Sequence, residues 1–148
     1  MIRPPAHPRP RGRWRRGATP AAGALALAIL ATGCTPEPMG GPLALTVQAD
    51  SPTVALQHIN EAGARCWMRA RDRAFDGLRL VPELDTAGSP RLLLVHSKRA
   101  QGLPVLVIEA SGSPVKIETY GPLATTSTGG RVNADIMRWS GGSADCKG

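Results

Sequence analysis

The chain has 148 residues, of which 18 are Lys or Arg and 11 are Asp or Glu, and its formal net charge is +7. A basic balance of this size is typical of nucleic-acid-binding proteins, but here it is concentrated at one end. The first 16 residues contain no acid and six arginines: Arg3, Arg9, Arg11, Arg13, Arg15 and Arg16. Without these six, 12 basic and 11 acidic residues remain, so nucleic acid is not an expected partner.

A weakly apolar run follows this basic segment and ends at a cysteine. Residues 18–33 make a run of about sixteen, fewer than the ~18 or more that a membrane-spanning helix requires, so they predict a signal peptide. The sequence Ala31-Thr32-Gly33-Cys34 at its end resembles the lipobox of bacterial lipoproteins. This resemblance implies that residues 1–33 are a cleaved lipoprotein signal peptide and that Cys34 is lipidated. An ordinary secretory signal with an incidental cysteine is the alternative.

The same resemblance implies a location in the cell envelope. Two or three acyl chains hold a protein stably on a membrane, whereas one chain does so only marginally. In Gram-negative lipoproteins an Asp after the lipidated cysteine favours the inner membrane, so Thr35 favours an outer-membrane anchor and a periplasm-facing domain. Residues 34–50 are rich in Pro and Gly and predict a flexible tether. The alternation of residues 43–47 also fits a short edge strand.

Removal of residues 1–33 would leave 115 of the 148 residues, enough for one domain over residues 51–148. Ser51-Pro52 is a helix-start signal, with Ser as the cap and Pro in the first turn. Apolar residues then recur at helical spacing and predict a helix over residues 53–66. Cys66 falls on the apolar side of this helix, so we expect its side chain to face the core.

Four short segments in the middle of the chain have the composition of strands: 78–84, 91–96, 103–110 and 115–120. Because short links join them, we predict a four-strand antiparallel meander. Pro82 indicates that the first strand lies at an edge. The second and third are continuously apolar, which predicts central strands covered on both faces, or on one face and by a partner.

The tail predicts a second helix. Val132, Ile136 and Trp139 recur at helical spacing between residues 124 and 139, and Asp135 is expected in the polar stripe. The two helices would lie on one face of the sheet. The expected fold is therefore α+β, with an N-terminal helix, the meander and a C-terminal helix.

Two cysteines remain once Cys34 carries lipid. Cys66 and Cys146 would be the only thiols of the mature chain, in an oxidising compartment, so we predict that they form a disulfide. The alternatives are a metal site or a redox pair. Both are disfavoured, because the two cysteines lack CxxC spacing and because only His58 and His96 are available as further ligands or as bases.

The mature chain contains none of the common catalytic motifs, so we predict no catalytic residue, metal or cofactor, and no enzyme. Three residues are candidates for ligand contact: Trp67, Trp139 and His96. The tryptophans would stack on sugar rings, and His96 would be the first titratable candidate of an enzyme. Each has a structural alternative, namely a core anchor for the tryptophans and a hydrogen-bonded structural residue for the histidine.

A basic face is a further candidate. Arg65, Arg69 and Arg73 would line one side of the first helix if it continued that far. On an anchored domain this side would contact the phosphates of anionic lipid or lipopolysaccharide. The alternative is a solvated face whose charge is balanced by Asp72 and Asp76.

Three functions remain. The preferred one is a non-enzymatic lipoprotein that binds an envelope protein partner, in assembly or maintenance, through a sheet face or edge. The second binds a lipid, glycan or small apolar molecule in a cavity lined by Leu94, Val105, Val107 and Ile136. The third is a small envelope enzyme centred on His96. The mature chain resembles small uncharacterised envelope lipoproteins of Gram-negative bacteria in size and layout, which supports a location rather than an activity.

Overall fold

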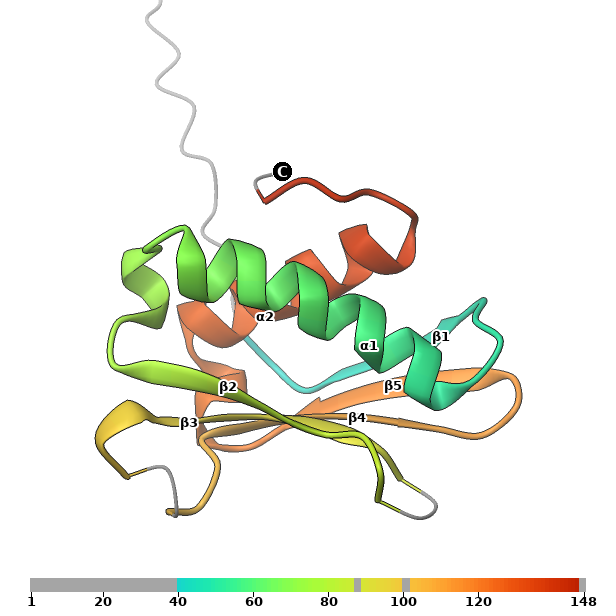
Figure 1. Cartoon of the computed structure of the whole chain (residues 1–148), viewed down its shortest axis with the longest axis horizontal. Helices are drawn as coiled ribbons and strands as arrows, with labels where there is room; N and C mark the ends of the chain where they lie inside the picture. The colour runs from blue at the N-terminus through green and yellow to red at the C-terminus, as the bar shows by residue number, and fades with distance from the viewer. Residues whose placement is uncertain (1–39, 87–88, 100–101, 147–148) are drawn as a thin grey trace, which may run out of the picture. The chain divides into compact units, whose positions relative to one another are not determined.

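The computed structural model describes residues 40–86, 89–99 and 102–146. The predicted signal peptide, Cys34 and the start of the tether lie outside the described residues. The described part is an α+β unit in which a five-stranded antiparallel sheet carries two helices on one face (Figure 1). The strands are β1 (Leu43–Val47), β2 (Leu78–Glu83), β3 (Arg91–His96), β4 (Leu106–Ser111) and β5 (Val115–Tyr120).

The strand order is β1-β5-β4-β3-β2, so β2 to β5 form the predicted meander, with β2 at an edge and with β3 and β4 in its interior. The prediction of four strands is incomplete because β1 precedes the first helix and pairs with β5. Leu43 pairs with Thr119, 76 residues later. Residues 43–47 therefore belong to the domain rather than to the tether.

Two helices cover the inner face. α1 (Pro52–Gly63) begins as predicted, because the Ser51 hydroxyl accepts a hydrogen bond from the Val54 N–H at 3.2 Å. The helical run passes the predicted end at Cys66 and continues as a π-helical segment, η1 (Ala64–Arg69). α2 (Ser127–Ser140) is the predicted C-terminal helix. The short 3₁₀ turns are η2 (Arg73–Phe75), η3 (Ser97–Arg99) and η4 (Pro122–Thr125).

The first turn of α2 contains a glycine pair that obscures its start in the sequence. The Thr126 hydroxyl caps this turn by accepting from the Gly129 N–H at 3.2 Å. A Cβ on Gly129 would collide with the backbone carbonyl of Leu123 in η4. Glycine is needed here because η4 packs against the backbone of α2, and the helix begins in spite of the low helix propensity of this residue.

The core lies between the inner sheet face and the helices. Leu56 and Ile59 of α1, and Val132 and Ile136 of α2, belong to one cluster with the inward side chains of the strands, and each is at most 1% exposed. The opposite face of the sheet carries neither α1 nor α2 (Figure 1). This outer sheet face is where side chains remain available to another molecule.

Candidate functional site

The two tryptophans that were candidates for ligand contact lie in the core, as their structural alternative predicted. Trp67 and Trp139 are each 1% exposed, and their ring centroids are 5.1 Å apart. Trp67 also stacks on Phe75, with 5.2 Å between the centroids. The indole N–H of Trp67 donates to Asp135 Oδ2 at 2.8 Å, and that of Trp139 to the carbonyl of Asp145 at 2.9 Å. The rings are therefore core anchors whose polar atoms are satisfied within the protein.

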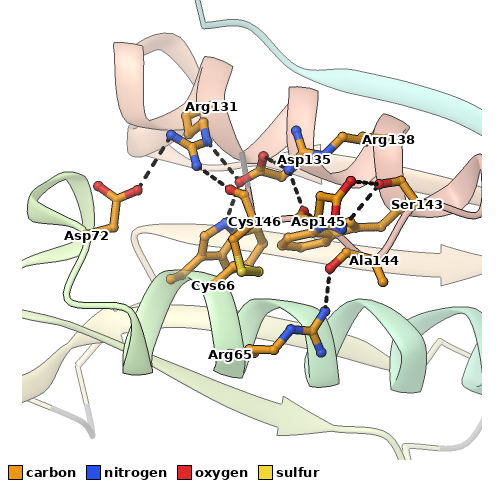
Figure 2. The surroundings of a disulfide bond; sticks show 12 residues. Arg65, Cys66, Asp72, Arg131, Asp135, Arg138, Ser143, Ala144, Asp145 and Cys146 are labelled. Atoms are coloured by element: carbon orange, nitrogen blue, oxygen red, sulfur yellow. Dashed lines mark hydrogen bonds and ion pairs between the residues drawn. A yellow bond between two sulfur atoms is a disulfide. The ribbon is translucent and has the colours of Figure 1, made fainter. Parts of the chain in front are cut away.

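Asp135 is the buried charge at the centre of the network in Figure 2. We predicted it in the polar stripe of its helix, but its side chain is 0% exposed. Its carboxylate accepts hydrogen bonds from Trp67, from Arg131 Nε at 3.0 Å and from Arg138 at 2.5 Å. Burial of a carboxylate requires such partners. The spacing of the two arginines, four residues before and three after Asp135, is a signal that sequence reasoning missed.

A disulfide joins Cys66 to Cys146, with their Cα atoms 4.9 Å apart, which confirms the predicted pairing (Figure 2). Arginine side chains donate to backbone carbonyls around Cys146: Arg65 to Ala144 at 2.8 Å, Arg138 to Asp145 at 3.1 Å and Arg131 to Cys146 at 2.8 Å. The disulfide and these contacts fix the C-terminal segment against η1 and α2. This network stabilises the fold.

His96 lies away from both tryptophans, at the end of β3, and its side chain is exposed. With Gly77 and the residues of η3 it lines an open hollow of about 460 Å³. Lys98 and Arg99 contribute to the walls of this hollow, and no carboxylate of the described residues does. His96 is therefore exposed in an open hollow that it shares with two cationic side chains.

The outer sheet face carries an apolar row across four strands. The register places Val81 opposite Leu93, Leu93 opposite Val107, and Val107 opposite Tyr120. Leu93 and Val81 are half-buried although neither α1 nor α2 covers them, and Tyr120 is 44% exposed. An apolar row on a sheet face that carries no helix is a candidate docking surface.

A charged row runs beside the apolar one. Glu83, Arg91, Glu109 and Glu118 lie opposite one another in turn across β2, β3, β4 and β5. Arg91 Nε donates to Glu83 at 2.6 Å, and the Tyr120 hydroxyl donates to Glu109 at 2.9 Å. Exposed pairs of this kind add little stability, but they hold the side chains in fixed positions. We call these two rows together the outer sheet face site.

The segment before β4 adds a wall to this site. Gly102 and Pro104 enclose, with the strand residues beneath, a hollow of about 390 Å³ whose floor includes Leu93 and whose rim includes Arg91. Val95 and Val107 beneath it are 2% and 7% exposed. The central strands are thus covered on one face by helices and only in part on the other.

Two groups in this site have shifted pKa values. The hydrogen bond and charge of Glu83 raise the pKa of Arg91 above its usual value. Burial, with a further contribution from the hydrogen bond to Glu109, raises the pKa of Tyr120 above its usual value. Arg91 therefore stays charged and the Tyr120 phenol stays protonated throughout the neutral range.

A second hollow, of about 340 Å³, lies between the β1–α1 connection and the end of α2, with Val47, Ile59 and Trp139 in its walls. The cavity predicted from Leu94, Val105, Val107 and Ile136 is not formed. Leu94 and Ile136 are fully buried in the core, whereas Val107 lies on the opposite face of the sheet, beside Leu93.

Among the described residues, no three His, Cys, Asp or Glu side chains are grouped as metal ligands would be. Nor does any helix in the described ranges combine the length and apolar character needed to cross a membrane. Comparison of the chain with protein-family models, with curated proteins and with solved structures finds no match.

Proposed function

We propose that the protein is an envelope lipoprotein, held by acyl chains on Cys34 in the outer membrane and facing the periplasm. The likeness of Ala31-Thr32-Gly33-Cys34 to the lipobox supports the anchor, and Thr35 supports the outer membrane. The Cys66–Cys146 disulfide supports an oxidising compartment such as the periplasm. The short segment before β1 then connects the domain to the lipid anchor.

We further propose that the domain is a non-enzymatic binding component that recognises another envelope protein through the outer sheet face site. The observation that carries this proposal is the apolar row Val81–Leu93–Val107–Tyr120, which neither helix covers and which the charged row borders. An apolar centre with a polar border, containing Tyr and Arg, has the composition of protein interfaces. We expect Tyr120 and Leu93 to contribute most of the binding energy for the partner protein.

We favour the outer sheet face site over the β2 edge of the sheet as the surface that binds the partner protein. β2 pairs only with β3 among the described strands, so one side of it is an edge. Pro82 lacks the N–H that an added strand would need, and the charged Arg79 and Glu83 flank it. These are the features by which proteins prevent pairing at an exposed edge.

Replacing Leu93 by Gln and Tyr120 by Ala together is expected to abolish partner recovery. Cells are cross-linked, the envelope is solubilised, the protein is purified, and the proteins that accompany it are quantified by mass spectrometry. Loss of one interface anchor typically costs about 2 kcal/mol or more, so affinity should fall at least 30-fold and the partner should disappear.

The matched control replaces two apolar residues on the helices, Val54→Gln with Met137→Ala, which are 45% and 49% exposed. This variant should retain the partner at the level of the unchanged protein. Thermal unfolding of both variants establishes that they remain folded. Equal partner recovery by the Leu93→Gln/Tyr120→Ala variant and its control would exclude the outer sheet face as the binding site.

A second candidate function is the binding of a small apolar or glycan ligand. The hollow of about 340 Å³ between the β1–α1 connection and α2 favours it, because ligand sites are concave and mainly apolar. A ligand there would contact Val54 and His58. Under this alternative, small molecules rather than a protein would accompany the purified chain, and the Val54→Gln change would remove them.

A further inference from the structure

Positive charge gathers at the end of the domain where η1 meets η2. Residues 65–76 contain four arginines and two aspartates, whereas the rest of the chain from residue 34 onward contains eight basic and nine acidic residues. Arg69, Arg71 and Arg73 are all exposed. The domain is nearly neutral as a whole, so this end is a local basic surface on it.

An open hollow of about 390 Å³ lies in this surface, beside the Cys66–Cys146 disulfide. Three arginines contribute to its walls: Arg71, Arg73 and Arg131. The donors of Arg131 are directed to Asp135, to the carbonyl of Cys146 and to Asp72. Arg131 is therefore fixed in place by the protein itself, as Figure 2 shows.

Asp72 is the one acidic residue that the described part of the chain contributes to the walls of the hollow, and its carboxylate already has partners within the protein. Asp72 lies 3.5 Å from Arg131 and accepts a hydrogen bond from the Ala74 N–H at 3.1 Å, as the cap of η2. Within the described residues, no carboxylate lies at ion-pair distance from the guanidinium of Arg71 or Arg73. The hollow thus presents two arginine side chains whose charge is not balanced inside it.

The backbone of Arg71 adds a second observation. Its φ angle is 53°, in the left-handed region, and it is the only non-glycine residue with positive φ in the described ranges. A glycine would adopt this conformation without strain. Arg71 directly follows Ala70, the C-cap of η1, a position at which helices commonly end in this conformation and usually carry glycine.

The hollow lies at the end of the domain where the chain enters from Cys34. A Cβ on Gly40 would collide with the carbonyl of Thr126, the cap of α2, so Gly40 lies against the start of that helix. The Thr128 hydroxyl, in the first turn, donates to the carbonyl of Ala74 in η2 at 3.3 Å. Gly40 and η2 are thus both adjacent to the first turn of α2.

Gly40 is the sixth residue after Cys34, and six residues of extended chain span at most about 20 Å. If Cys34 is anchored as proposed, the hollow therefore lies within reach of the headgroup layer. Arginine binds phosphate oxygens through paired N–H donors, which gives stronger and more directional contacts than a point charge.

We propose that Arg71 and Arg73, supported by Arg131, bind the phosphate of an anionic lipid headgroup in the membrane that carries the anchor. This inference rests on the proposed lipid anchor. The contact would hold the domain at the membrane with its η1–η2 end toward the lipid. It would leave the outer sheet face, which is a separate surface, available to a protein partner.

The test uses the chain from residue 34 with Cys34→Ser, which carries no acyl group but retains every described element and the disulfide. Its binding to phosphatidylglycerol vesicles and to phosphatidylcholine vesicles is measured by sedimentation. It should bind the anionic vesicles, and more weakly as salt is raised. Each arginine near such a surface contributes about fivefold, so Arg71→Gly with Arg73→Gln should weaken binding about 25-fold.

The control is Arg79→Gln, an exposed arginine of β2 that does not line the hollow, and it should bind the vesicles more tightly than the double variant. Arg71→Gly alone should lose about fivefold in binding while its melting temperature is not lowered, because glycine relieves the strained φ. If Arg71 had only a structural role, Arg71→Gly would lower both the vesicle binding and the melting temperature. Equal binding of the double variant and the unchanged chain would overturn the proposal.

Binding of inorganic phosphate that the double variant loses, without any binding to vesicles, would assign the hollow to a soluble phosphate and would also overturn the membrane contact. The acylation of Cys34 is measured separately, on the chain extracted from cells. If Cys34 is not acylated but the chain binds vesicles, the lipid anchor is wrong and the arginine site is not. If Cys34 is acylated but the chain does not bind vesicles, the arginine site is wrong and the anchor is not.

Discussion

Replacing Asp135 by Ala is expected to destabilise the domain by about 3–5 kcal/mol, measured by urea unfolding. The buried carboxylate accepts hydrogen bonds from Trp67, Arg131 and Arg138. Its removal would leave the partly buried guanidinium group of Arg138 without a compensating charge, that of Arg131 with only the more distant Asp72, and the indole N–H of Trp67 without an acceptor. A loss of this size is a large fraction of the stability of a small domain.

The control is Asp76→Ala, because Asp76 is exposed and makes no ion pair within the described residues. Its free energy of unfolding should change by no more than about 0.5 kcal/mol. A loss below about 1 kcal/mol for Asp135→Ala would mean that the network in Figure 2 does not stabilise the fold.

Removing the disulfide by Cys66→Ala with Cys146→Ala is the second change with a large expected effect. The two cysteines are 80 residues apart in sequence, and closure of a loop of this length lowers the entropy of the unfolded chain. The corresponding stabilisation is about 4.5 kcal/mol, and measured losses for native disulfides are about 2–5 kcal/mol. We expect a loss in that range, measured by urea unfolding without reductant.

Reductant provides the control for this prediction. Dithiothreitol should destabilise the unchanged chain to about the level of the double variant, and should leave the variant unchanged. Because Arg131 contacts both Asp135 and the carbonyl of Cys146, the losses from Asp135→Ala and from disulfide removal should not be additive. An unfolding midpoint that is the same with and without the disulfide would contradict a structural role for it.

Local sequence patterns were sufficient to predict much of the fold. The Ser51-Pro52 signal located the start of α1, and Pro82 placed β2 at an edge of the sheet. The turn residues between the apolar segments located β2 to β5. These features succeeded because capping, proline geometry and strand alternation depend on neighbouring residues.

Features that depend on distant residues could be predicted only in part. β1 has only five residues, and it is stabilised by pairing with β5 and by the Leu43 N–H donating to Thr119 at 2.9 Å. Asp135 is buried because Trp67, 68 residues away, donates to it. The rows of the outer sheet face exist only once the register of four strands is known. The alternation of residues 43–47 and the arginines on either side of Asp135 are local signals, but they identify neither the partner strand of β1 nor the buried surroundings of the carboxylate.

The intact mass of the membrane-extracted protein tests the central proposal, a lipid-anchored envelope protein, most directly. The result we predict is the mass of residues 34–148 with the Cys66–Cys146 disulfide formed and two or three acyl chains on Cys34. Sequential extraction should place this species in the outer-membrane fraction. A soluble product cleaved at another position, with Cys34 removed or unmodified, would contradict the anchor, and with it the membrane position of the arginine hollow.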